Sequence, residues 1–586
     1  MQATFYRVML ERGAQHDLLQ RYAPVLRMDA RELFLPIPVD AYVEASVLHL
    51  PDGSTTDSVT LAELDHRWPP GSHLRFVSVE ERRAVVSDEI RRTARKLLSP
   101  RLGRVGLFGR VLDALFLLSI FLRPTTPRRT TTAAATKMDR IQSSTAPVCY
   151  GRAFHEGEWL VLHYAYFYAM NDWRSSYRGV NDHEGDWEQT WVYCDPATER
   201  PEWVAASSHD LHGADLRRHW SDPELVKLKD RPVLFPGAGS HAMYFQPGDY
   251  VTRIDVPSLR WLLRAQRWSQ RWLGIIDEAT ERGLGPALGA PFVDAASGDG
   301  PELRDWDLRV MDVDDGWLGS FRGMWGFDTR DRTGGERGPS GPKFDRTGDI
   351  RSSWADPLGF AGLHGSPPPS AMDNRINQAK VDQVIETLNE EIRQRARLLP
   401  LAEQTGSADD MAGDSARLTS LLRQRSELVD LRGRIERGDG PAIGLRDHLR
   451  GPAVPLPPPA ASGWLLAGWA ALSVPLLLTA VALVLLIDEA RVAVALIGAG
   501  AVALLLEQLF RRRLRALVRL LVLEILLALF VIFALGVAVT VSRYAAGAAL
   551  VVAAIVLFIA NLGELRAVQH YRSAQDPSLP DREPVV

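Results

Sequence analysis

The last quarter of the chain contains the feature that most constrains its fold, a long and nearly uninterrupted apolar stretch. From residue 463 to residue 562 almost every side chain is apolar, whereas the preceding residues mix charged and apolar side chains. The stretch divides into four segments that are each long enough to cross roughly 30 Å of hydrocarbon as a helix. These segments are residues 463–487, 492–509, 520–542 and 544–562. The sequence therefore predicts four transmembrane helices over 463–562.

The charges beside these segments predict an orientation. The connection between the second and third segments is rich in arginine, while each of the other two connections offers a single one, Arg491 or Arg543. Arginine-rich connections stay in the cytoplasm. The first twenty residues contain acids and glutamines where a signal peptide needs an apolar core. We therefore expect an integral membrane protein with its N-terminal domain and its tail, residues 563–586, in the cytoplasm.

The overall composition limits the classes of partner and of covalent cross-link that the chain can have. The 586 residues carry a net charge of -4, so no basic excess favours nucleic acid as a partner. Cys149 and Cys194 are the only cysteines, too few for a disulfide framework.

A helical hairpin is expected between the N-terminal part and the apolar stretch, over residues 371–437. Apolar residues recur at steps of three and four in two stretches. The first contains Ile385, Leu388, Ile392 and Leu399, and the second contains Leu421, Leu428, Leu431 and Ile435. This spacing is typical of the seam between paired helices. The hairpin would form a coiled-coil-like stalk, followed by a proline-rich linker at 451–461. The stalk and the transmembrane helices would also offer surfaces for homo-oligomers.

The N-terminal part, residues 1–362, is predicted to form a β-rich domain. Runs rich in aromatic and β-branched residues recur from residue 159 onward, separated by short turns with Gly, Pro, Asp and Asn. This pattern predicts an antiparallel β-sandwich-like domain with inserted helices. The expected fold class is thus α+β and multidomain: this domain, the antiparallel helical hairpin and the four-helix transmembrane region.

An acidic cluster within this domain is the strongest functional signal. If a strand begins near Asp186, its period of two places Asp186, Glu188 and Thr190 on one face, and Trp187 and Trp191 on the other. Two carboxylates this close need a neutralising partner. A divalent metal, with the nearby His183 as a further ligand, is one solution. The alternative is that backbone amides or nearby arginines satisfy the carboxylates without metal.

These residues belong to a set of ordered blocks that resembles a known family. The blocks, within residues 20–362, are YAPVLRMDARELFLPIPVDAYV, LVLHYAYFYAMNDW, NDHEGDWEQTWVY, SSHDLHG, PGAGSHAMYFQPGDY, FRGMWGFD, and GPSGPKFD followed by WADPLGF. They resemble the vacuolar-protein-sorting-associated family built around an H-x-G-D-W-E core. The core is also similar to the G-H-R-H-D-W-E signature of the necrosis-inducing, lipid-binding cytolysins.

The second resemblance implies a metal site in a β-sandwich. Cytolysins of that kind bind a divalent cation and recognise sphingolipid sugar headgroups, and the matching ligands here are Asp172, His183, Asp186 and Glu188. Three carboxylates and one imidazole suit Mg, Ca or Mn. The chain departs from that signature by placing Glu184 and Gly185 where the cytolysins have Arg and His, so their toxicity is not implied.

Three functions are compatible with these features. The first is a membrane-anchored, divalent-metal-containing binding module that recognises a polar lipid headgroup or envelope component at the cytoplasmic membrane face. The second is a metal-dependent hydrolase acting on a membrane-associated phosphoester or glycolipid, with His209, Glu184 or His241 as candidate acid or base. The third is an oligomeric structural or pore-forming membrane protein. The sequence leaves open whether the protein is an enzyme.

Overall fold

The computed structural model describes most of the N-terminal two thirds of the chain and shorter parts of the remainder. It covers residues 8–369 apart from several gaps, parts of 381–433, and residues 453–456, 463–486 and 547–558. The main gaps are 87–109, 112–113, 115–128, 173–181, 209–212, 255–289, 328–337 and 346–347.

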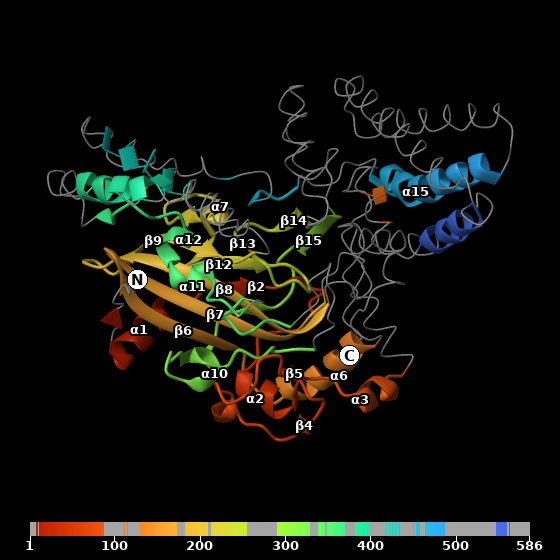
Figure 1. Ribbon diagram of the computed structural model, residues 1–586, viewed down its shortest axis with the longest axis horizontal. Helices are drawn as coiled ribbons and strands as arrows, with labels where there is room; N and C mark the ends of the chain where they lie inside the picture. The colour runs from red at the N-terminus through yellow and green to blue at the C-terminus, as the bar shows by residue number, and fades with distance from the viewer. Residues whose placement is uncertain are drawn as a thin grey trace, which may run out of the picture.

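A seven-stranded sheet forms the centre of the molecule (Figure 1). Its order is β1-β6-β7-β8-β9-β10, and β17 pairs with β6. The strands are β1 (Val8–Met9), β6 (Val148–Glu156), β7 (Trp159–Asn171), β8 (His183–Asp195), β9 (Arg200–Ala206), β10 (Arg218–His219) and β17 (Asp307–Val310). β7 and β8 are buried along their whole length, because both faces of the sheet are covered.

A second sheet packs on one face of the first. It has the order β11-β12-β2-β16, with β13 pairing β12. Its strands are β2 (Val25–Arg27), β11 (Lys227–Leu228), β12 (Arg231–Pro236), β13 (Met243–Tyr244) and β16 (Glu302–Leu303). The core between the sheets joins Leu26, Leu234 and Met243 of the second sheet to Tyr166 and Val192 of the first. A separate ribbon, β14 (Gly248–Ile254) with β15 (Ala290–Ala296), continues beyond β13.

The two sheets are mixed, which corrects the expected antiparallel sandwich. β6, β7, β8 and β9 pair antiparallel, as the short turns between β6 and β7 and between β8 and β9 require. However, β2 pairs parallel with β12, and β17 pairs parallel with β6. Parallel pairing needs a long connection between the paired strands. Both parallel pairs join segments far apart in the sequence, which turn signals between neighbouring runs do not reveal.

Helices and a small sheet cover the opposite face of the large sheet. They lie below it in Figure 1, while β12–β15 lie above. Their core cluster includes Tyr42, Leu74, Met138, Trp187 and Trp317. The elements on this side are α2 (Val39–Glu44), β3 (Val47–His49), β4 (Thr55–Thr56), the 3-10 helix η1 (Leu61–Glu63), β5 (His73–Arg75), α3 (Val79–Ala84), α6 (Thr130–Gln142) and α10 (Gly316–Gly319).

Four further helices pack against these sheets. α1 (Arg12–Tyr22) contributes Leu18, Leu19 and Tyr22 to the core between the sheets. α7 (Gly213–Leu216), α11 (Ser352–Ala355) and α12 (Pro357–Phe360) are single turns. α12 begins where Pro357 follows Asp356, whose carboxylate accepts the amide of Gly359, a normal helix N-cap.

Two helical stretches contact each other in the region where a stalk is expected. Leu421 and Leu428 pack with Val381, Ile385 and Leu388. Arg425 donates to Asn389 at 2.6 Å and Arg432 pairs with Asp382 at 3.4 Å. Because the higher-numbered arginine meets the lower-numbered partner, the two stretches run antiparallel. The predicted seam residues Leu399, Leu431 and Ile435 lie outside the described residues.

The prediction of four transmembrane helices is wrong for the part of the chain that the structure describes. There, no helix combines the length and the apolar character needed to cross a bilayer. α15 (Gly463–Leu486) contains Pro475, which removes a backbone hydrogen bond inside the helix, and its Ser473 contacts the guanidinium of Arg110 at 3.1 Å. The described part of the other C-terminal helix, residues 547–558, is shorter than the roughly 20 residues that a span requires. The expected integral membrane location, which depended on these spans, is corrected with them.

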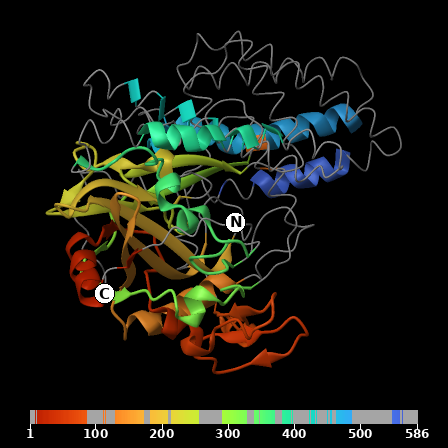
Figure 2. The same ribbon diagram turned by 60° about the vertical axis from the view of Figure 1, so that its left-hand side comes forward.

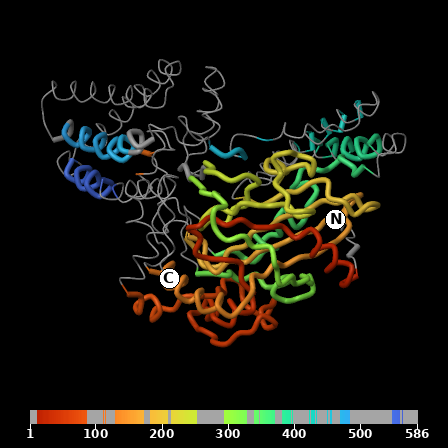
Figure 3. Tube along the Cα trace, turned by 180° about the vertical axis from the view of Figure 1, so that it is seen from behind, coloured from red at the N-terminus to blue at the C-terminus, as the bar shows by residue number. Residues whose placement is uncertain are grey.

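The two C-terminal helices pack together instead. Val474 of α15 contacts Leu557 of helix 547–558, and Ala114 joins the same cluster. Figure 2 and Figure 3 show the two helices side by side. The second and third predicted spans lie outside the described residues.

Candidate functional site

Gly185 sets the geometry at the start of β8. Its φ of 67° lies in the left-handed region, and a Cβ there would lie 2.2 Å from the carbonyl oxygen of Trp325. Only glycine fits such a position without strain. The pairing register skips this residue, running from Met170 opposite Glu184 to Tyr168 opposite Asp186. The irregularity interrupts the alternation of side chains, so that Glu184 turns away from the face that carries Asp186.

Beyond Gly185 the alternation follows the prediction. Asp186 and Glu188 lie opposite Tyr168 and Tyr166, whose rings belong to the core between the sheets. Trp187 belongs to the core on the other face. The two carboxylates therefore point between the two sheets.

His241 supplies the partner that Asp186 needs. Its Nδ1 lies 2.8 Å from Asp186 Oδ2, and its Nε2 lies 3.4 Å from Glu32 Oε1. The second contact is an ion pair without hydrogen-bond geometry. Both ring nitrogens thus face carboxylates, which suits an imidazolium with a proton on each nitrogen. The ring stacks on Tyr168 with centroids 3.7 Å apart and an interplanar angle of 6°.

The turn between β12 and β13 holds His241 in an uncommon conformation. His241 has a φ of 56°, which non-glycine residues rarely adopt. The turn is closed by the His241 amide donating to Gly237 at 2.8 Å and the Gly237 amide donating to Ala242 at 2.9 Å. Such a conformation persists only where its surroundings fix it, and here two carboxylates and the Tyr168 ring do so.

Further donors surround both carboxylates of the triad Glu32–His241–Asp186. Asp186 accepts the Asn171 side-chain amide at 3.3 Å and its neighbour's backbone amide at 3.0 Å. Glu32, in the segment after β2, accepts the amides of Leu33 and Phe34 at 2.8 Å and that of Gly239 at 2.7 Å. The triad joins β8, the segment after β2 and the β12–β13 turn, and so ties the two sheets together.

The pKa values follow from this arrangement. Burial by itself would lower the pKa of His241, but the charge of Glu32 and the hydrogen bond to Asp186 raise it to about 10. Burial by itself would raise the pKa of Asp186, but the hydrogen bond and charge of His241 outweigh it, and the pKa is lowered. At neutral pH the triad is therefore an imidazolium between two carboxylates.

Glu188 behaves differently from Asp186. Burial, followed by the negative charge of Asp186, raises the pKa of Glu188 well above its usual value. Its carboxyl group contacts the Ser207 hydroxyl, which also accepts the Gln189 amide at 2.8 Å. The pKa values of two carboxyl groups two residues apart are thus shifted in opposite directions, that of Asp186 down and that of Glu188 up.

The metal site predicted from Asp172, His183, Asp186 and Glu188 is not borne out. Among the described residues no group of three or more His, Cys, Asp or Glu side chains is arranged to hold a metal ion. The sequence correctly required a positive partner for Asp186, but that partner is a histidine of the chain.

The other predicted residues have separate roles. His183 Nδ1 lies 2.8 Å from the Gly185 carbonyl oxygen, and its charge contributes to the lowered pKa of Asp186. Asp172 is buried, and its backbone amide donates to Gly239 at 3.0 Å.

Two of the three catalytic candidates, Glu184 and His241, lie on opposite faces of β8. Glu184 lies on the opposite face, where it accepts the amides of Val77 at 2.9 Å, Phe327 at 3.3 Å and Phe76 at 3.4 Å. It is a buried carboxyl that fixes backbone segments. His209 lies outside the described residues.

Sequence reasoning missed Glu32, Asn171 and Ser207 as parts of this site. Glu32 lies in the first block of the family resemblance, within the letters MDARELF, but nothing in that run shows that the segment reaches β8. Asn171 follows from the pairing register, since it lies opposite His183 across the β7–β8 pair.

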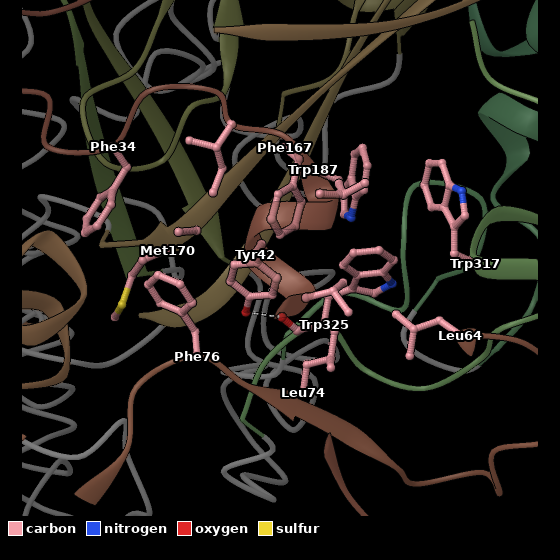
Figure 4. Close-up of a cluster of buried hydrophobic side chains, with 14 of the residues drawn as sticks. Phe34, Tyr42, Leu64, Leu74, Phe76, Phe167, Met170, Trp187, Trp317 and Trp325 are labelled. Atoms are coloured by element: carbon pink, nitrogen blue, oxygen red, sulfur yellow. Dashed lines mark hydrogen bonds between the residues drawn. The ribbon is translucent and has the colours of Figure 1, made fainter. Parts of the chain in front are cut away.

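The opposite face of the same two strands carries an aromatic cluster. Figure 4 shows Phe167 and Trp187 packed with Trp325, and the Tyr42 hydroxyl donating to the Trp325 carbonyl oxygen at 2.6 Å. This carbonyl is the one that excludes a side chain at residue 185. The aromatic cluster therefore holds in place the irregularity that directs Asp186 toward His241.

Comparison with known proteins adds no assignment. No protein-family model, no curated protein and no solved structure matches the chain.

Proposed function

We propose that the chain is a non-catalytic binding module that recognises a polar lipid headgroup or another polyhydroxyl envelope component at the triad end of the two sheets. One observation carries the proposal. Two buried polar atoms beside the triad, Tyr168 OH and Asn171 Oδ1, have no hydrogen-bond partner among the described residues. Each such atom costs about 1–3 kcal/mol when left without a partner, and a polyhydroxyl ligand supplies both donors and acceptors.

The charge state of the site supports binding over hydrolysis. His241 is an imidazolium at neutral pH, with both nitrogens facing carboxylates. A general base must accept a proton near the working pH, and a histidine with a pKa of about 10 is a weak candidate. Glu188, whose pKa is raised, and Asp186, whose pKa is lowered, instead place a hydrogen-bonding carboxyl group beside a negative charge.

The test uses the full chain and vesicles of phosphatidylcholine with or without a galactosyl diacylglycerol. We expect greater retention on the glycolipid vesicles and no released galactose. Calorimetry with methyl galactoside separates recognition of the sugar alone from recognition of the lipid surface. Equal retention on both kinds of vesicle would rule out the proposal, and released galactose would favour a hydrolase.

Tyr168→Phe is the informative variant. Because this hydroxyl has no protein partner, its loss leaves the melting temperature unchanged or slightly higher, but weakens glycolipid retention by about tenfold, the value of one hydrogen bond. Tyr193→Phe is the matched control, since the Tyr193 hydroxyl donates to the Pro357 carbonyl oxygen at 2.7 Å. The control lowers the melting temperature and leaves retention unchanged.

A further inference from the structure

α15 presents an exposed apolar stripe. Leu472, Leu476 and Leu483 are 42%, 53% and 36% exposed, although the helix buries Ala471 and Val474 on another side. These three leucines and Thr479 are separated by steps of four, three and four residues. Such steps place side chains on one face of a helix. The Thr479 hydroxyl donates to the Pro475 carbonyl oxygen at 2.8 Å within the helix, so the stripe presents no unsatisfied polar group at this point.

The neighbouring helix 547–558 repeats the feature. Val552 and Ile555 are 61% and 54% exposed, while Ala554 and Leu557 are buried. Leu557 packs against Val474 of α15, so each helix uses one side for this contact and leaves another side exposed. No charged residue occurs between positions 463 and 486 or between 547 and 558.

We propose that this stripe is an interface between two copies of the chain. Alternating steps of three and four match the spacing at which one helix packs against another, so the expected occupant is a helix. A second copy presents the same uncharged stripe, and twofold pairing brings a patch against itself.

The exposed area fits a dimer. The stripe and its neighbours on helix 547–558 expose on the order of 500 Å² of apolar surface, as much as the largest patch of an ordinary monomer. A twofold pair would bury on the order of 1,000 Å² in total, the size at which a specific interface is expected.

The test measures the mass of the full chain by light scattering during size-exclusion chromatography over a range of concentrations. We expect a dimer, and we expect Leu476→Glu to weaken dimerisation at least about tenfold, because the change buries an unpaired charge at the centre of the interface. Val313→Glu is the matched control, since Val313 is 37% exposed and lies in the β-rich part of the chain. Circular dichroism checks that both variants are folded.

Cross-linking provides a second readout. Cys149 and Cys194 are both buried, so Leu476→Cys adds an accessible thiol. Oxidation should then give a covalent dimer that Val313→Cys does not give. A monomer at every concentration, or equal masses for the wild type and Leu476→Glu, overturns the proposal. Insertion of a monomer into phosphatidylcholine vesicles, lost in Leu476→Glu, overturns it in favour of lipid as the occupant.

Discussion

The two faces of the β7–β8 pair are both buried, but they are stabilised in different ways. One face carries Phe167 and Trp187 in an aromatic cluster, whose stability depends on shape and apolar area. The other carries Asp186 with the imidazolium of His241, whose stability depends on charge balance. The same strands thus contain an aromatic cluster that is insensitive to pH on one face and a charged triad that is sensitive to it on the other.

Removal of the charged partner should have the largest effect on stability. His241→Leu leaves the carboxylates of Asp186 and Glu32 buried without their cation, and loss of one member of a buried ion pair costs about 3–5 kcal/mol. Urea denaturation at neutral pH measures this loss. A second variant, His241→Leu with Asp186→Asn, should recover part of it. A single variant as stable as the wild type would show that the charged face contributes as little as a surface ion pair.

The next largest effect is expected in the pH dependence of stability, which should differ between the two faces. The pKa of His241 is about 10 in the folded chain, above its unfolded value near 6.5. Its contribution is therefore complete below about pH 6.5 and is lost as the pH rises toward about 10. The pKa of Asp186 is lowered, so its contribution is lost as the pH falls below about 4.

Melting temperatures between pH 3 and pH 10 check this prediction. Relative to the wild type, His241→Leu should lack the alkaline loss, whereas an aromatic-face variant such as Trp187→Phe should keep it. Parallel profiles for all three proteins would contradict the assigned charge state.

A smaller loss of stability is expected when a hydroxyl group is removed from the aromatic cluster. Tyr42→Phe removes the hydrogen bond to the Trp325 carbonyl oxygen and leaves that oxygen buried, which costs about 1–3 kcal/mol. The loss should be the same at pH 5 and pH 8, because no charged group is removed. Thermal unfolding at the two pH values measures it, and a loss confined to one of them would argue against a purely apolar face.

The smallest change in stability is expected for a substitution of Glu188. Burial and the charge of Asp186 raise its pKa, so the fold favours the neutral carboxyl form, which glutamine imitates. Such a group loses stability as the pH rises above its unfolded pKa, so Glu188→Gln should be at least as stable as the wild type at pH 7, within about 0.5 kcal/mol. Asp186→Asn, the matched change at an ionised group, should destabilise. Equal losses in both variants would show that the two carboxyls share one protonation state.

Part of this arrangement could be predicted from the sequence. The alternation of Asp186 and Glu188 against Trp187 follows from the period of a strand, and the need for a neutralising charge follows from electrostatics. The flip at Gly185 could not be predicted, because it depends on the Trp325 carbonyl oxygen lying beside residue 185. That contact joins segments about 140 residues apart.

The identity of the cation and the C-terminal fold were harder to predict. His241 was a candidate for chemistry, yet only the close approach of the β12–β13 turn to β8 makes it the partner of Asp186. The apolar run at 463–562 indicated membrane spans because hydropathy records composition and length. Hydropathy does not show the packing of α15 on helix 547–558 or the contact of Ser473 with Arg110.

The parallel pairing of β17 with β6 has a consequence for synthesis of the chain. Residues 148–151 of β6 receive their outer neighbour only when Asp307–Val310 arrives. A ribosome makes roughly 5–20 residues each second, so this strand edge stays open for several seconds or longer in every nascent chain. Open edges recruit strands from other molecules. The growing polypeptide is therefore most vulnerable to misassembly in the interval before residue 310 leaves the exit tunnel.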